Sequence, residues 1–311
     1  MIRLSYAVCT YNRAARLPAL IAAMRAQACP LPFEILVIDN NSSDNTPRVL
    51  ETLAAQPGPP LRVVRETRQG ISHARNRALD EAAERDFLVF IDDDELPRPG
   101  LLSAALACLD EEQLDCVGGR VHVDFSGLSR PGWLGDELLG FLAEVDYGDT
   151  PFRIEDADHP VWTANIAYRM RLFREHPDLR FDLRYNRAGK AVGGGEDIRM
   201  FEAMLERGLR LGYCPGMVVD HAVEPWRLRR RYFLALHYES GRKQGLYGPD
   251  SPAVRWLGVP RFLFPQLLRQ AGRTLGCLFS RRAGCLRQAM NLTHAAGLIA
   301  GHWQRARGQG A

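Results

Sequence analysis

Three consecutive carboxylates, Asp92, Asp93 and Asp94, directly follow an apolar run at residues 87–91. Alternate residues of an extended chain point the same way, so Asp92 and Asp94 should share one side if the strand conformation continues. Such oxygen donors suit Mg²⁺ or Mn²⁺, which keep open positions for the phosphate oxygens of a substrate. An acidic turn without a ligand is the alternative, but adjacent carboxylates repel one another unless a cation neutralises them. The pattern therefore predicts a metal site.

A second acidic pair, Glu196 and Asp197, follows three consecutive glycines (residues 193–195) and opens a helical pattern over about residues 197–207. Acidic residues at a helix start can simply compensate the helix dipole. Three glycines, however, let the backbone approach a substrate closely, and a carboxylate on such a loop suits a general base for a hydroxyl group. We therefore predict a catalytic role for this pair.

Two further polar residues each have two interpretations. His221 follows a predicted strand at residues 211–219 and is either a third metal ligand or a core or capping histidine. Asn165 ends the sequence Trp162-Thr163-Ala164-Asn165, which ordinary strand packing would also explain.

Alternating strand and helix patterns position these residues. Apolar runs predict strands at residues 4–10, 33–39, 61–66 and 87–91, and helical spacing predicts helices at 14–28, 46–55 and 72–84. This succession implies a largely parallel sheet with helices on both faces. Ligands bind beyond the carboxyl ends of such strands, and all four runs end in polar residues, so we expect a pocket at that edge.

The second half of the chain has a looser pattern. Further strands are predicted at residues 116–123, 163–169 and 211–219. From Trp226 onward the spacing is helical, with interruptions at residues 245–252, Pro260 and Pro265. Residues 124–160 have the least regular pattern, and we expect them to shape an acceptor pocket.

Other phosphate-binding motifs are absent from the sequence. The chain lacks G-x-x-x-x-G-K-[ST], and its three consecutive glycines do not form G-x-G-x-x-G after a strand. Residues 39–44 lack the glycine that a calcium loop needs at its sixth position. The sequence therefore does not support a P-loop, a dinucleotide-binding fold or an EF-hand.

Composition indicates a globular protein. The 311 residues are 46% hydrophobic and 25% charged, which excludes disordered, collagen-like and small disulfide-rich proteins. Seven scattered cysteines without a C-x-x-C pair predict reduced core residues in a cytosol. The short apolar N-terminus does not resemble a signal peptide, and no stretch reaches the length of a membrane span, so we expect a cytoplasmic protein.

Charge is distributed unevenly along the chain. Residues 225–311 contain 15 Arg or Lys and two acidic residues, giving +13, so a total of +3 leaves −10 for the first 224 residues. A basic tail with aromatic residues predicts contact with an anionic membrane surface, nucleic acid or a phosphorylated acceptor. A solvated helical face is the alternative.

Five signatures, in order over about residues 3–245, resemble family 2 nucleotide-sugar glycosyltransferases of the GT-A fold. They are Thr10-Tyr11-Asn12-Arg13, Ile38-Asp39-Asn40-Asn41-Ser42-Ser43-Asp44, the segment 70–79, the D-x-D of Asp92 to Asp94, and Glu196-Asp197. The resemblance implies an α/β fold with a Rossmann-like, mixed but mostly parallel sheet flanked by helices. It also implies a nucleotide-sugar-binding half (1–115), an acceptor-binding and catalytic-base half (116–224) and a basic helical extension (225–311).

The resemblance assigns roles in donor binding. The residues that would bind the nucleotide sugar are Thr10, Tyr11, Asn12, Arg13, Asp39, Asn41, Arg75, Asp92, Asp93 and Asn165. Among them, Tyr11 and Asp39 would hold the nucleotide base, for which uracil is favoured. Arg75 would lie near the base or the diphosphate, and Asn165 near the donor sugar.

The resemblance also implies a metal site and a mechanism. Asp94, with Asp92 and His221, would bind Mn²⁺ or Mg²⁺. Asp197 matches the catalytic base and Glu196 its helper, although the sequence leaves open which of the two is the base. The reaction would invert the anomeric carbon in a single displacement, with the metal neutralising the departing nucleoside diphosphate.

The expected partners are a nucleoside-diphosphate sugar donor and a glycan or lipid-linked acceptor in cell-surface polysaccharide, lipopolysaccharide or glycolipid assembly. Cations and large apolar residues mix at residues 226–233, 261–264 and 281–282, which predicts peripheral attachment to the cytoplasmic face of the inner membrane. No nucleic-acid partner is expected. The alternatives are a nucleotidyltransferase using the same metal-nucleotide site and a non-catalytic membrane-associated scaffold.

Overall fold

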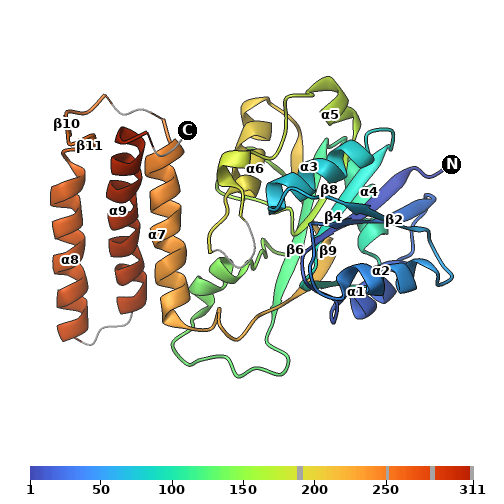
Figure 1. Cartoon of the computed structure of the whole chain (residues 1–311), viewed down its shortest axis with the longest axis horizontal. Coiled ribbons are helices and arrows are strands. Elements are labelled where there is room, and N and C mark those ends of the chain that lie inside the picture. The colour runs from blue at the N-terminus through green and yellow to red at the C-terminus, as the bar shows by residue number, and fades with distance from the viewer. Residues whose placement is uncertain (188–191, 250–251, 281–283, 309–311) are drawn as a thin grey trace. The chain divides into compact units, whose positions relative to one another are not determined.

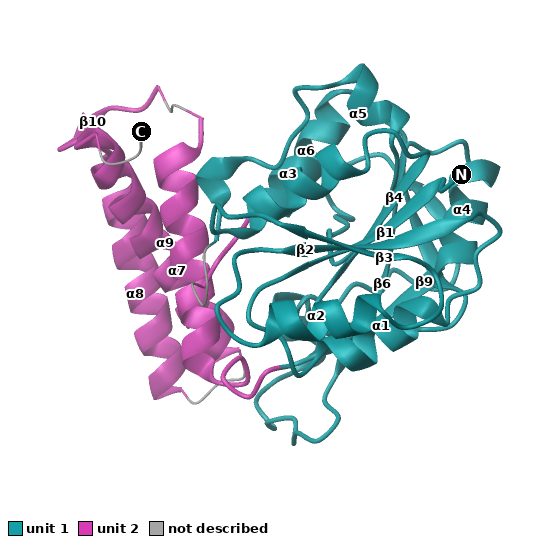
Figure 2. Ribbon diagram, turned by 45° about the vertical axis from the view of Figure 1, so that its right-hand side comes forward, with its two compact units in different colours: residues 1–189, 196–223 teal, residues 190–195, 224–311 magenta. Residues whose placement is uncertain are grey.

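The computed structural model describes residues 1–187, 192–249, 252–280 and 284–308. The chain divides into two compact units, coloured separately in Figure 2 and labelled by element in Figure 1. Unit 1 comprises residues 1–189 and 196–223, and unit 2 comprises residues 190–195 and 224–311. All the residues predicted to do chemistry belong to unit 1.

Unit 1 is built on a nine-stranded mixed sheet. In spatial order its strands are β3 (Leu61–Arg65), β2 (Phe33–Asp39), β1 (Leu4–Thr10), β4 (Phe87–Asp92), β8 (Asn165–Arg169), β6 (Cys116–Asp124), β9 (Leu211–Ala222) and β5 (Glu95–Pro97), with β7 (Phe152–Ile154) paired to β9. The first four strands in this order are parallel, and β8 is antiparallel to both of its neighbours. The predicted α/β fold class is confirmed.

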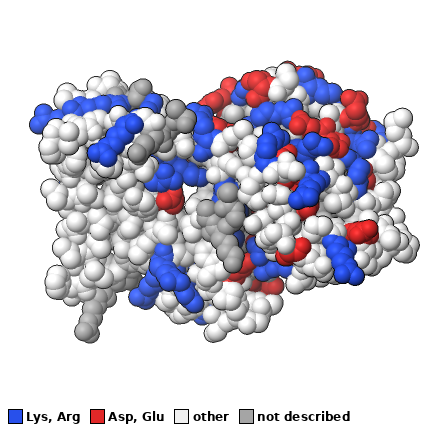
Figure 3. Space-filling view, in the orientation of Figure 1, with Lys and Arg blue, Asp and Glu red and all other residues white. Residues whose placement is uncertain are grey.

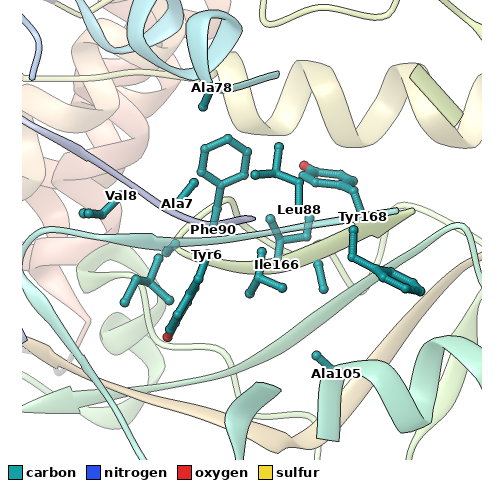
Figure 4. Close-up of a cluster of buried hydrophobic side chains, with 14 of the residues drawn as sticks. Tyr6, Ala7, Val8, Ala78, Leu88, Phe90, Ala105, Ile166 and Tyr168 are labelled. Carbon is teal, nitrogen blue, oxygen red and sulfur yellow. The ribbon is translucent and has the colours of Figure 1, made fainter. Parts of the chain in front are cut away.

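Helices cover both faces of this sheet. They are α1 (Leu17–Arg25), α2 (Thr46–Ala54), α3 (Ile71–Glu81), α4 (Leu101–Glu111), α5 (Arg171–Glu175) and α6 (Glu196–Glu206), with 3-10 turns at Asp136–Leu142 and Leu183–Tyr185. In Figure 2, α1 and α2 lie on one face and α3 and α6 on the other. Tyr6 and Phe90 point to opposite faces (Figure 4), and Phe90 meets Tyr168 edge to face, with ring centroids 6.3 Å apart.

The strand register brings the predicted site residues to one edge. Every residue of β1 is buried, because helices cover both faces of a parallel strand of this kind. Thr10 pairs with Asp39 across β1 and β2, and Cys9 pairs with Asp92 across β1 and β4. The polar residues that follow these strands therefore share the carboxyl edge of the sheet.

Some elements differ from their predicted bounds. Helix α1 begins at Leu17 rather than at residue 14, with Pro18 in its first turn, where a missing N–H costs no hydrogen bond. Helix α4 was not predicted, although Leu102, Leu106 and Leu109 have helical spacing.

The prediction of seven reduced core cysteines is wrong for part of the set. Cys108 on α4 and Cys214 on β9 form a disulfide that joins positions 106 residues apart. Cys277 and Cys285 have sulfur atoms 2.6 Å apart. Cys9 and Cys116 are buried free thiols, whereas Cys29 is partly exposed. Sequence spacing gave no sign of the Cys108–Cys214 disulfide, because folding alone brings these partners together.

The described residues of unit 2 form three helices, α7 (Arg230–Tyr247), α8 (Leu263–Phe279) and α9 (Cys285–Ala306), and a short hairpin of β10 (Arg255–Trp256) and β11 (Val259–Pro260). The predicted interruption at residues 245–252 is present but begins only after Tyr247, because Gly245 lies inside α7; residues 250 and 251 lie outside the described part of the chain. The predicted interruption at Pro265 is wrong, because Pro265 lies in the first turn of α8, where proline is tolerated. Within the described residues, no helix is both long and apolar enough to cross a membrane.

Glycines let α7 and α9 approach at backbone distance. A Cβ at Gly245 would lie 2.4 Å from the Leu298 carbonyl oxygen, and one at Gly301 would lie 2.0 Å from the Arg242 carbonyl oxygen. A Cβ at Gly241 would likewise meet His294, and one at Gly297 would meet Tyr238. Residue numbers therefore rise together from 241/294 to 245/298 and from 238/297 to 242/301, so the helices run parallel. No other residue type fits without moving one helix.

Gly301→Ala should therefore lower the free energy of unfolding of unit 2 by about 1–3 kcal/mol, the usual cost of overpacking. The matched control is Gly272→Ala on α8, where an added Cβ meets nothing within 4 Å. That change should stabilise the protein by roughly 0.5–1 kcal/mol, because alanine favours a helix over glycine. Thermal unfolding followed by circular dichroism compares the two, and equal effects would contradict the close packing.

Candidate active site

The loops after β1 and β2 bind each other at the carboxyl edge of the sheet. Asp39 is buried, and its Oδ1 accepts a hydrogen bond from the Ser42 N–H at 3.1 Å. Asn12 Oδ1 accepts from the Ser43 N–H at 2.8 Å. Asn12 and Asn41 have φ of 54° and 60°, a left-handed conformation that asparagine tolerates. These two polar loops form one wall of the predicted donor site.

The carboxylates that follow β4 each have their own neighbouring side chains. Asp93 Oδ2 accepts a hydrogen bond from Thr10 Oγ1 at 2.8 Å, and its Oδ1 lies 3.4 Å from Arg13 Nε. Burial, together with the neighbouring Asp94 carboxylate, raises the pKa of Asp93 to about 7. Two residues of the first signature therefore tie the end of β1 to the D-x-D turn.

Glu95 begins β5 directly after this turn and was not singled out from the sequence. Its Oε2 accepts a hydrogen bond from the Asp92 N–H at 2.8 Å, and β5 pairs it with His221 on β9. Burial raises the pKa of Glu95 to about 8, against the opposing effect of His221. Its position directly after three aspartates was the available signal.

Arg75 lies at the centre of the site, on α3. Its guanidinium is buried and lies 2.8 Å from Glu196 Oε1, 3.2 Å from Asp92 Oδ1 and 3.6 Å from Asp197 Oδ2. Burial alone would lower its pKa, but these carboxylates raise the pKa of Arg75 above its ordinary range. The aromatic ring of Phe181 covers the guanidinium, 5.6 Å from its centroid. One cation thus joins the D-x-D turn to the start of α6.

The two acidic residues that open α6 differ in access. The Glu196 side chain is 5% exposed and is engaged by Arg75, whereas the Asp197 side chain is 24% exposed. Burial and the adjacent Asp197 raise the pKa of Glu196 to about 7, while Arg75 opposes that shift. A base must reach a substrate hydroxyl, so the geometry favours Asp197 for that role.

Asp94 and His221 are the part of the predicted metal site that lies together. His221 Nδ1 is 3.4 Å from Asp94 Oδ1, and both side chains are buried. No three His, Cys, Asp or Glu side chains in the described part of the chain are arranged to hold a metal ion, since Asp92 faces Arg75. The carboxylate and imidazole nevertheless fit a divalent cation whose remaining positions are filled by substrate phosphate oxygens.

Two predicted donor contacts have contrasting environments. Tyr11 is partly exposed at the end of β1. Asn165 is buried, and its Nδ2 donates to the carbonyl oxygens of Arg120 and Met217 at 3.0 and 2.9 Å. Asn165 therefore joins strands β6, β8 and β9, and its contact with a donor sugar stays a prediction.

The part of the chain that forms the sheet edge and the D-x-D turn matches a known family. The model of "Glycosyl transferase family 2" matches residues 5–177, more than half of the chain. The chain belongs to glycosyl transferase family 2. The matched span includes the D-x-D turn and Arg75, while Glu196 and Asp197 of this family 2 chain lie beyond it.

Several known proteins are similar to this family 2 chain. It is 27% identical over 249 residues to the hyaluronan synthase of Pasteurella multocida, which covers 72% of this chain and 25% of that protein. It is 25% identical over 282 residues to the glycosyltransferase AglE of Haloferax volcanii, covering 85% of this chain and 84% of AglE. The chain thus spans about a quarter of the synthase but most of AglE.

The fold of this family 2 chain is also that of a solved structure. S. aureus TarS residues 1–349 in complex with UDP gives a TM-score of 0.57 at 19% identity, covering 99% of this chain and 92% of that one. The nine-stranded mixed sheet flanked by helices is therefore a GT-A fold, as the sequence predicted.

Proposed function

We propose that this chain transfers a sugar from a nucleoside-diphosphate sugar, with a UDP-sugar favoured, to a hydroxyl of a glycan or lipid-linked acceptor. The acceptor would belong to cell-surface polysaccharide, lipopolysaccharide or glycolipid assembly. The proposal rests on the contact of Arg75 with Asp92 and Glu196. This contact joins the sheet edge that would bind the nucleotide to an acidic pair suited to base catalysis. TarS structures with UDP and with UDP-GlcNAc support the choice of donor class.

The residues of the chain would divide the work of an inverting displacement. Asp197, the more accessible acid, would remove the proton from the acceptor hydroxyl. Arg75 would keep Asp197 beside the D-x-D turn, so that the acceptor oxygen and the anomeric carbon meet in one geometry. Asp94 and His221 would hold Mn²⁺ or Mg²⁺, which supplies charge neutralisation for the departing diphosphate.

Calorimetric titration with UDP, GDP and dTDP, with and without Mn²⁺, tests the donor site. We expect UDP to bind most tightly, Mn²⁺ to strengthen that binding, and Asp94→Asn to remove the strengthening. The matched control is Asp156→Asn, which changes an exposed acidic residue on a loop and should bind as the wild type does. Equal UDP binding with Mn²⁺ and with a chelator would contradict the metal site, and no binding of any nucleotide would contradict the donor site.

A further inference from the structure

The outward face of α8 in unit 2 is apolar and exposed. Leu268, Leu275 and Phe279 are 73%, 55% and 87% exposed, and their spacing of seven and four residues places them on one side of the helix. Leu263 and Thr274 lie on the other side and are buried. The helix therefore uses one face for packing inside unit 2 and presents a second apolar face that unit 2 does not cover.

The hairpin before α8 extends this apolar surface. Trp256 and Leu257, at its turn, are 59% and 70% exposed. The Trp256 ring packs edge to face against Phe264 in the first turn of α8, with centroids 5.3 Å apart. Hairpin and helix thus present one surface, here named the α8 face: Trp256, Leu257, Leu268, Leu275 and Phe279.

The charge around the α8 face has a single sign. Residues 251–311 contain nine arginines and no Asp or Glu. Arg269 and Arg273 are exposed on α8 itself, one turn apart. In Figure 3 the helical unit on the left is largely white and blue, with little red. A second copy of this face would bring arginines against arginines, whereas an anionic surface complements them.

We propose that the α8 face binds an anionic phospholipid bilayer, with α8 lying in the plane of the interface. An exposed apolar stripe bordered by arginines, with an aromatic residue at one end, is the pattern of an interfacial helix. The segment at residues 226–233, also expected to bind membrane, fits less well, because Phe233 is buried and the Trp226 ring packs edge to face against Tyr232. This inference concerns attachment and does not depend on the transferase reaction.

Flotation of the full chain with vesicles tests the proposal. One vesicle set contains phosphatidylcholine alone and the other contains phosphatidylcholine mixed with phosphatidylglycerol. We expect binding to the anionic vesicles, weakened by high salt, and little binding to the neutral ones. Leu275→Glu/Phe279→Glu and Arg269→Glu/Arg273→Glu should each lower the partition coefficient roughly tenfold or more.

Single-residue controls place the same types of substitution, Leu→Glu and Arg→Glu, outside the α8 face. Leu183→Glu alters a leucine in unit 1 that is 50% exposed, and Arg48→Glu alters an exposed arginine on α2. Both controls should float as the wild type does, and circular dichroism should show every variant folded. Equal partition onto both vesicle sets, or wild-type partition of the α8 variants, would overturn the proposal. The proposal would also be overturned if the chain bound neither vesicle set and formed a dimer that Phe279→Glu dissociates, because a second copy would then cover the α8 face.

Discussion

Asp197→Asn should leave the donor nucleotide bound but slow sugar transfer by roughly 10²- to 10⁴-fold, the usual contribution of a general base. Asparagine keeps the size of the side chain but cannot accept the proton of the acceptor hydroxyl. Arg75, 3.6 Å away, loses one of three carboxylate neighbours and keeps the other two, so the fold should persist. Release of the nucleoside diphosphate and its binding, measured separately, distinguish the two effects.

Two companion variants make this measurement decisive. Glu196→Gln should reduce transfer less, because Glu196 is almost inaccessible and acts through Arg75. Glu202→Gln, on the same helix and paired with Arg199, is the matched control and should transfer at the wild-type rate. Wild-type transfer by Asp197→Asn, or a larger loss in Glu196→Gln, would reverse the roles given to the pair. Release of pyrophosphate instead of nucleoside diphosphate would identify a nucleotidyltransferase.

Arg75→Met should have the largest effect on stability, lowering the free energy of unfolding by about 3–5 kcal/mol. The change leaves Glu196, Asp92 and Asp197 without the cation that they share, and Glu196 is buried. Removing one partner of a buried ion pair costs more than the pair contributes, because the remaining charge stays desolvated. Urea unfolding measures the loss, and sugar transfer should fall with it.

The same helix provides the control for Arg75. Arg77→Met breaks a pair with Glu81 one turn apart on the surface of α3, which should change stability by less than about 0.5 kcal/mol. Arg75→Met/Glu196→Gln should recover part of the lost stability, because the stranded buried charge is removed. If Arg75→Met proved as stable as Arg77→Met, Arg75 would not be holding the acidic residues together.

The sequence was sufficient to predict the strands in the first half of the chain and the edge of the sheet at which the candidate site lies. Strands β1 and β2 have their predicted bounds, because continuous apolar runs bounded by turn residues leave little ambiguity. Helix α4 was missed, although Leu102, Leu106 and Leu109 have helical spacing and are buried. The Cys108–Cys214 pair joins elements 106 residues apart, and no local pattern encodes such a pairing.

Within the site, residue types were predictable but partners were not. The D-x-D turn, His221 and the acidic pair could be selected from their positions after strands and glycines. The link from Arg75 on α3 to Glu196, 121 residues later, follows from tertiary packing alone. Glu95 was overlooked because its buried hydrogen bond to the Asp92 backbone depends on the pairing of β5 with β9.

The close contact of α7 with α9 sets an order of events during synthesis. The ribosome completes α7 at Tyr247 but finishes α9 only at Ala306, so the glycine strip of α7 has no partner until a further 59 residues have been added. Unit 1, whose last residue is Val223, is complete much earlier and can fold first. Unit 2 must then form after unit 1, and a nascent chain that stops before α9 leaves α7 without its packing surface.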